Sequence, residues 1–126
     1  PVTILNYPEG TRFTKTKHDN TKSSFKHLLK PRAGGIHTVL RSLGDELTAI
    51  LNVTLVYPGH SSPNLTDLMQ GRVPRIVVRV EPLTLGEGHV PSLETIRGKG
   101  GSLAVRKCLN ELWESKDTLI SNIQTD

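Results

Sequence analysis

An arginine that follows a short apolar run and a turn is the residue of this chain best placed for chemistry. Residues 2–7 are largely apolar and predict a strand, which stops at Pro8, Glu9 and Gly10 just before Arg12. Ligands of open α/β sheets bind outside the carboxyl ends of the strands. A guanidinium is permanently charged and binds two oxygens of a phosphate or carboxylate at once. We therefore expect an anion-binding site at Arg12.

The residues next to Arg12 would complete such a site. Gly10 lets the backbone approach a ligand closely, and the Thr11 hydroxyl can donate one hydrogen bond. Glu9 would accept a hydrogen bond from a ligand hydroxyl or hold Arg12 in its rotamer. The alternative interpretation is a tight turn with a surface ion pair between Glu9 and Arg12, worth about 0–1 kcal/mol.

The basic residues are unevenly distributed along the chain, whose net charge is +4. Residues 1–32 hold seven Lys and Arg against two acidic residues, and the other 94 residues hold nine against ten. A nucleic-acid-binding protein spreads its excess over a face or stripe. The pattern therefore indicates a phosphorylated small molecule or an anionic membrane surface as the partner, and no nucleic acid.

Two of these cations, Lys30 and Arg32, stand at the start of a predicted helix. Cations at that position oppose the helix dipole, so their presence favours an anionic ligand. We expect them to bind the same anion as Arg12. The alternative interpretation is a solvated helix end.

Length and composition predict one domain over residues 1–126. No segment approaches the roughly 20 consecutive apolar residues of a membrane-spanning helix. The single cysteine, Cys108, excludes an internal disulfide and cannot alone hold a structural metal, which indicates a reducing compartment and no metal site.

Hydrophobic periodicity predicts two helices and three strands. The helices are expected at residues 32–43, with Pro31 at the entry position, and from the candidate N-cap Ser102 onward. The strands are expected at residues 2–7, 52–57 and 75–81, separated by loops at 13–30, 58–74 and 84–101, with one helical turn around 65–69. This order predicts the α/β class, with a short mixed sheet, a crossover helix that makes the first two strands parallel, and a C-terminal helix. Because a sheet would begin at the first residue, we expect part of the domain to precede it.

Four segments resemble the glycerolipid acyltransferases, the 1-acylglycerol-3-phosphate (lysophosphatidate) acyltransferases. Residues 7–13 (YPEGTRF) resemble the family's Phe-Pro-Glu-Gly-Thr-Arg block, and residues 28–36 (LLKPRAGGI) resemble its Leu-Pro-Arg-Thr-Lys-Gly stretch at the start of a helix. Residues 52–57 (NVTLVY) resemble the strand after that helix, and residues 112–117 (LWESKD) resemble the C-terminal helix of a bacterial inner-membrane branch. Order and spacing agree over most of the chain, which resembles the C-terminal portion of the α/β domain of such a protein.

The resemblance implies acyl transfer in phospholipid biosynthesis, from a thioester of coenzyme A or acyl carrier protein to the hydroxyl of a lysophosphatidate-type acceptor. It implies no cofactor beyond that acyl thioester. It also implies a parent protein associated with the cytoplasmic face of a membrane, the bacterial inner membrane for the branch named above. The residues that it assigns to binding of the acceptor are Glu9, Gly10, Thr11, Arg12, Lys30 and Arg32.

Two departures from the family pattern bear on activity. The family's catalytic signature is a histidine with an aspartate five residues later, and none of the five histidines of this chain has one. We expect the catalytic pair upstream of this chain, and we expect the isolated chain to be inactive. The lysine of the family's Leu-Pro-Arg-Thr-Lys-Gly stretch falls on Gly34, so Arg32 or Lys30 would have to supply that charge.

Two other hypotheses follow from the same residues. According to the first, the chain is a non-enzymatic module that binds an anionic ligand, such as a phospholipid headgroup or an RNA loop. According to the second, it is an interaction domain that uses exposed edge strands.

Overall fold

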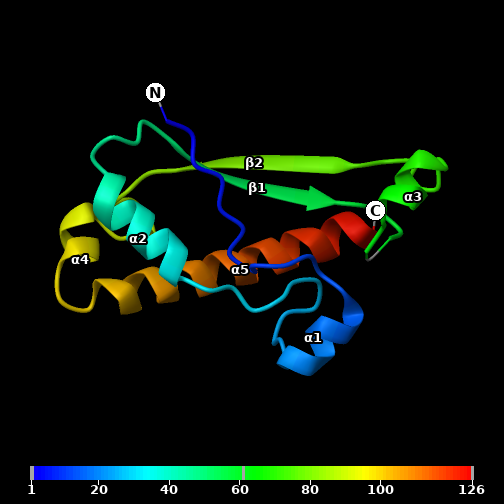
Figure 1. The fold of residues 1–126 in the computed structure, drawn as a ribbon, viewed down its shortest axis with the longest axis horizontal. Helices are drawn as coiled ribbons and strands as arrows, with labels where there is room; N and C mark the ends of the chain where they lie inside the picture. Colours follow the sequence, from blue (N-terminus) through cyan, green and yellow to red (C-terminus); the bar gives the residue numbers. More distant parts are fainter. Residues whose placement is uncertain (1, 61, 126) are drawn as a thin grey trace.

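One long helix, α5, supports most of the fold (Figure 1). The computed structural model describes residues 2–60 and 62–125. The elements in chain order are α1 (Lys15–Thr21), α2 (Gly34–Leu43), β1 (Ile50–Val56), α3 (Leu65–Met69), β2 (Val77–Leu83), α4 (Leu93–Arg97) and α5 (Gly101–Thr125). The two strands lie along one side of α5, and α2 and α4 pack at its N-terminal end.

The buried residues of α5 recur every three, four or seven positions and so form one face of the helix. Val105, Leu109, Trp113, Ile120 and Ile123 are buried on this face. Leu109 and Trp113 pack with Phe25 from the loop after α1, while Ile120 and Ile123 pack with Val56 of β1. The core is therefore two clusters strung along one helix.

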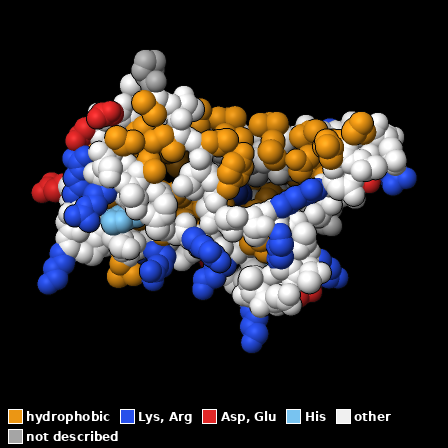
Figure 2. All heavy atoms as spheres, in the orientation of Figure 1, with side chains coloured by type: hydrophobic (Ala, Val, Ile, Leu, Met, Phe, Trp, Pro, Cys, Tyr) orange, Lys and Arg blue, Asp and Glu red, His pale blue; other side chains and the backbone are white. Residues whose placement is uncertain are grey.

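The sheet has two antiparallel strands, with Thr54 opposite Arg79 and Val53 opposite Val80. Thr54 and Val56 point toward α5, and Val56 is only 2% exposed. The opposite face is apolar and exposed, and it appears as the band of hydrophobic side chains along the upper edge in Figure 2. Its members are Leu51, Val53, Leu55, Val78 and Val80. Among the helices of the described residues, α5 alone packs on this sheet.

The expected strand at residues 2–7 and the parallel crossover are wrong. Residues 2–7 are extended but pair with no strand in the described chain, and most of their side chains are exposed. A β-branched run becomes a strand only where a neighbour offers hydrogen bonds and cross-strand contacts. The sheet is therefore a two-stranded antiparallel pair rather than a short mixed sheet, and α2 connects no parallel strands.

The loop expected at residues 13–30 contains the helix α1. Thr14 caps its start by accepting a hydrogen bond from the Lys17 backbone N–H at 3.2 Å, and Lys22, with φ of 52°, ends it. A threonine at the N-cap is a sequence signal for a helix start. The helix is short and buries no residue, so it gives no apolar periodicity to detect.

Most other elements lie close to their expected positions. The helix α2 falls inside the predicted range 32–43, and α3 confirms the helical turn at 65–69. Both strands of the sheet are displaced by two residues or fewer at each end from their predictions. The helix α5 begins at Gly101, so Ser102 lies inside it and is not the N-cap, and the short helix α4 interrupts the expected loop 84–101. None of the helices in the described part of the chain is both long and apolar enough to cross a membrane.

Candidate functional site

The Glu9–Arg12 segment begins with a tight turn. The Gly10 N–H donates to the Tyr7 carbonyl at 2.9 Å, which closes a four-residue turn with Pro8 in its second position, where proline is favoured. Gly10 has a φ of +71°, a left-handed conformation that side-chain-bearing residues rarely adopt. The glycine is therefore required by the turn itself, before any contact with a ligand.

The Glu9 carboxylate points into the protein. Its Oε1 accepts the Trp113 indole N–H at 3.1 Å and the Leu29 backbone N–H at 3.2 Å. Trp113 is 5% exposed and Leu29 is 4% exposed, so both donors belong to the core. The predicted contact between Glu9 and Arg12 is absent from the ion pairs and hydrogen bonds of the described residues.

A lysine completes the surroundings of Glu9. The Lys116 Nζ lies 4.6 Å from the centroid of the Trp113 ring and donates to the Val53 carbonyl at 2.9 Å. Burial raises the pKa of Glu9, while the hydrogen bonds from Trp113 and Leu29 and the charge of Lys116 act in the opposite direction. Burial likewise lowers the pKa of Lys116, and the charge of Glu9 opposes that change. Each charge is thus half-buried and offsets part of the desolvation cost of the other.

The second predicted basic segment lies beside the turn. The Arg32 N–H donates to the Pro8 carbonyl at 2.8 Å, next to the bond from Leu29 to Glu9. Leu29 and Pro31 are buried, whereas Lys30 and Arg32, which alternate with them, are exposed. The structure therefore brings together the two segments that the sequence predicts to form one site, and both basic side chains of the second face solvent.

Arg12 is exposed, and among the described residues its guanidinium forms no ion pair or hydrogen bond. The backbone around it is held from α1, because the Lys17 Nζ donates to the Thr11 Oγ1 at 2.7 Å and to the Arg12 carbonyl at 3.3 Å. The Thr11 hydroxyl therefore accepts one bond and keeps its proton for another acceptor. Two cavities are lined by residues other than these: one of about 260 Å³ between the sheet and α5, and one of about 390 Å³ on α5 itself. Arg12 lines neither cavity, and its side chain is exposed.

The loop that carries Lys30 and Arg32 is pinned to α5 by one carboxylate. The Asp117 oxygens accept the backbone N–H groups of Lys26 at 2.8 Å and His27 at 2.7 Å. The His27 ring also bonds to the Ser121 hydroxyl at 3.0 Å. Sequence reasoning assigned no role to Asp117 or Lys116. The available signal was their place in the LWESKD segment, whose Trp113 is buried in the core.

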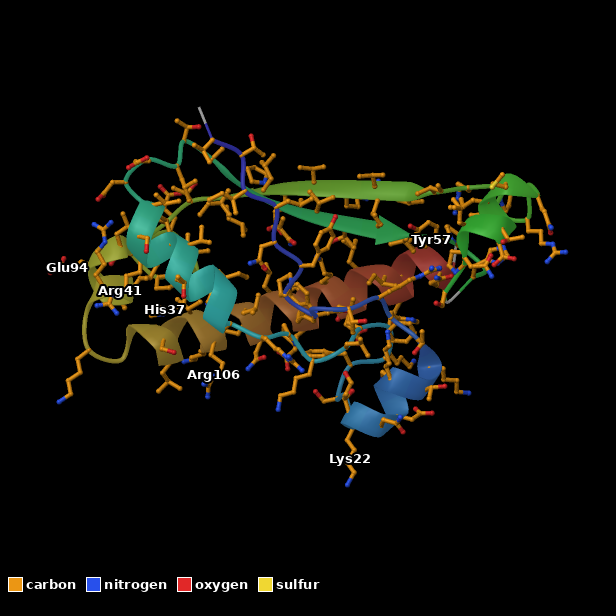
Figure 3. All side chains as sticks on the ribbon, in the orientation of Figure 1. Lys22, His37, Arg41, Tyr57, Glu94 and Arg106 are labelled. Carbon is orange, nitrogen blue, oxygen red and sulfur yellow. The ribbon has the colours of Figure 1, made fainter. Side chains whose placement is uncertain are left out.

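Other polar groups hold the fold together. The His37 ring contacts the Ile96 carbonyl at 3.3 Å and so ties α2 to α4. Figure 3 shows His37 and Arg41 on α2, well apart from Lys22 at the end of α1. Burial and the charge of Glu111 raise the pKa of the Cys108 thiol, as for a packing side chain. In the described ranges, no group of three His, Cys, Asp or Glu residues is placed to hold a metal ion.

Comparison with known proteins gives a family for this chain. It is 30% identical over 124 residues to 1-acyl-sn-glycerol-3-phosphate acyltransferase gamma of Mus musculus, which covers 92% of this chain and 30% of that protein. It is 27% identical over 139 residues to the epsilon enzyme of Mus musculus (95% of this chain, 35% of that protein) and 30% identical over 125 residues to the delta enzyme of Bos taurus (90% and 30%).

The chain thus spans about a third of the length of these relatives. No family model and no solved structure matches it. These three relatives are mammalian proteins, and the bacterial inner-membrane branch stays a prediction. At about 30% identity over most of its length, this chain belongs to the 1-acyl-sn-glycerol-3-phosphate acyltransferase family.

Proposed function

We propose that the protein containing this chain transfers an acyl group from an acyl thioester to the hydroxyl of a lysophosphatidate-type acceptor, and that this chain binds the acceptor phosphate. Family membership supports the reaction class. The observation that carries the phosphate assignment is the exposed Arg12 guanidinium on a turn whose backbone is bonded by the Arg32 N–H on one side and by the Lys17 ammonium on the other. The thioester carrier is coenzyme A or acyl carrier protein.

The two basic segments would act on the phosphate together. Arg12 offers a planar pair of donors that match two phosphate oxygens. Lys30 and Arg32 belong to the strip of backbone bonded to Pro8 and Glu9, so their charges add to the positive potential there. A phosphate held in this way fixes the acceptor hydroxyl relative to the acyl donor. Such positioning lowers the activation barrier of acyl transfer, although the arginine itself neither makes nor breaks a bond.

The proton-transfer part of the reaction lies outside the residues of this site. An attacking hydroxyl needs a base, usually a histidine oriented by a carboxylate. No histidine of this chain is followed by aspartate at the family spacing. We propose that the isolated chain binds the acceptor without acylating it, and that the whole protein works at a membrane surface, on its cytoplasmic side, where the lipid acceptor resides.

The test is a kinetic comparison in the longer natural protein. Losing the charged hydrogen bonds of Arg12 in Arg12→Ala should raise KM for lysophosphatidate about 10- to 100-fold. KM for the acyl donor should change less than about twofold. Lys15→Ala removes another exposed cation three residues away and is the matched control. Equal losses toward both substrates would contradict phosphate binding by Arg12.

The binding-module hypothesis makes a different forecast for the same protein. It expects lysophosphatidate to bind through Arg12 while no acylated product forms, whatever thioester is supplied. Product formation by the longer protein would exclude it.

A further inference from the structure

The carboxylate of the Glu-Gly-Thr-Arg segment is the group whose position least suits a ligand contact. We infer that Glu9 is a positioning residue, which holds the Arg12 turn to α5 through Trp113 and to the segment before α2 through Leu29, and that it is not a ligand of the acceptor. This inference rests on the proposed function, because it concerns how the phosphate-binding arginine is held.

The hydrogen bonds of Glu9 join three distant parts of the chain. One oxygen, Oε1, receives both the Leu29 N–H, 20 residues away, and the Trp113 indole N–H, 104 residues away. Both donors lie in the core, so neither has solvent as an alternative partner. A Glu9 that turned outward to a glycerol hydroxyl would leave two buried donors unsatisfied.

The surroundings of Trp113 favour the inward position further. The ring is stacked under the Lys116 ammonium and packs against Phe25 and Leu109. Lys116 is itself tied to the Val53 carbonyl of β1. The contacts of the ring with Phe25, Leu109 and Lys116 therefore restrict its orientation and direct the indole N–H at the Glu9 carboxylate.

Fixing Glu9 has consequences for both basic segments. Arg12 follows it by three residues, across a glycine turn closed by a single backbone bond. Lys30 directly follows Leu29, whose N–H Glu9 accepts. Releasing the carboxylate would loosen the turn and the neighbouring strip together, so the cations would sample more positions and bind a phosphate less well.

Trp113 is the single tryptophan of the 126-residue chain, so its fluorescence reports the link directly. We would measure the emission maximum and the binding of a short-chain lysophosphatidate, with monoacylglycerol as the control lacking the phosphate. Circular dichroism of each variant would establish that it is folded.

Three variants of that chain separate positioning from ligand contact. Glu9→Gln keeps an oxygen for both donors, so emission should not change and affinity should stay within about threefold of wild type. Glu9→Ala should shift emission to the red and weaken binding about five- to tenfold, through a lost anchor. Arg12→Ala should leave emission unchanged and lose the phosphate-dependent binding.

If Glu9→Ala does not fold, a milder pair replaces it. Trp113→Phe removes the indole donor but keeps an aromatic ring, and it should weaken binding several-fold. Glu9→Gln, which keeps the acceptor oxygen, should stay within about threefold of wild type, so a loss confined to Trp113→Phe marks the bond to the indole, and an unchanged affinity of Trp113→Phe would overturn the inference.

Two further results would overturn the inference. A large loss of binding in Glu9→Gln with unchanged emission would show that the Glu9 charge touches the ligand. Unchanged emission in Glu9→Ala would show that the link to Trp113 does not form. Failure of the proposed function has another signature: wild type would not distinguish lysophosphatidate from monoacylglycerol, while the Glu9→Ala emission shift would still support the link.

Discussion

The two ends of the Glu9–Arg12 segment differ in almost every physical respect. Glu9 is half-buried and bonded to the core through Trp113 and Leu29, whereas Arg12 is exposed and has no side-chain partner in the described structure. The three-residue step between them crosses a turn that only glycine adopts easily. The comparison teaches that one short motif combines an anchor and a contact group, and that its charged residues need not share one role.

The same division recurs in the neighbouring segment. Leu29 and Pro31 are buried, while Lys30 and Arg32 are exposed beside the turn. In both segments the buried residues face the protein, Glu9 bonding to Trp113 of α5, and the exposed residues present the cations. Changes to anchors should therefore reduce stability, and changes to cations should reduce phosphate binding alone.

The largest expected loss of stability comes from the anchor of the loop before Lys30. Phe25 is 8% exposed and packs with Leu109 and Trp113. Truncating it in Phe25→Ala should lower the free energy of unfolding by about 3 kcal/mol, because a buried aromatic ring leaves a cavity. Urea denaturation would measure this, with the half-buried Phe13→Ala as the control. A smaller loss of unfolding free energy for Phe25→Ala than for Phe13→Ala would contradict the role of Phe25 as an anchor.

A smaller loss is expected at the carboxylate that pins the same loop. Asp117→Ala removes the acceptor of two backbone N–H groups and should cost about 2 kcal/mol. Asp117→Asn keeps one acceptor oxygen and should cost roughly half as much. Glu114→Ala, an exposed acidic residue on α5, is the control and should stay within about 0.5 kcal/mol. Equal effects of the 117 and 114 substitutions would contradict the pinning role.

The turn between anchor and contact group should show a glycine-specific cost. Gly10→Ala places a side chain at a φ of +71°, and we expect a loss of about 1 kcal/mol from backbone strain alone, since no atom lies within 4 Å of the added carbon. Gly34→Ala has equal space without a positive φ, so it should be neutral or slightly stabilising. Comparing the thermal unfolding of Gly10→Ala with that of Gly34→Ala separates the cost of backbone strain from the effect of the added methyl group.

The smallest expected effect is a difference between wild type and Glu9→Gln in how stability depends on pH. The pKa of Glu9 is raised above its ordinary value of 4.5, so the folded state holds that proton more tightly than the unfolded state does. The contribution of Glu9 to stability should therefore be greatest below pH 4.5 and decline as the pH rises through the folded pKa. We expect the stability of wild type relative to Glu9→Gln to fall over that window. A rise instead would mean that the hydrogen bonds and Lys116 outweigh burial.

Local patterns were enough to predict the turn, α2 and the last helix. Pro8, Gly10 and the spacing of apolar residues in α5 carry their information within a few positions, and the structure follows them. The strand at residues 2–7 could not be excluded in this way, because strand formation depends on a partner elsewhere in the chain.

Long-range partners account for two further features that the sequence could not predict. The indole donor to Glu9 lies 104 residues away, and nothing in the Glu9–Arg12 segment itself points to Trp113. In β1, Thr54 and Val56 are buried while Val53 and Leu55 are exposed. Both faces of that strand carry apolar residues, so alternation could not say which of them meets α5.

The claim on which the account depends is that a phosphate binds at the exposed Arg12 guanidinium. The most direct measurement is NMR of the Arg12 Nε–Hε resonance during titration with short-chain lysophosphatidate. We predict a saturable shift of this resonance that monoacylglycerol does not produce, with the Trp113 indole signal nearly unchanged. A shift at Trp113 with none at Arg12, or equal shifts with both lipids, would contradict it.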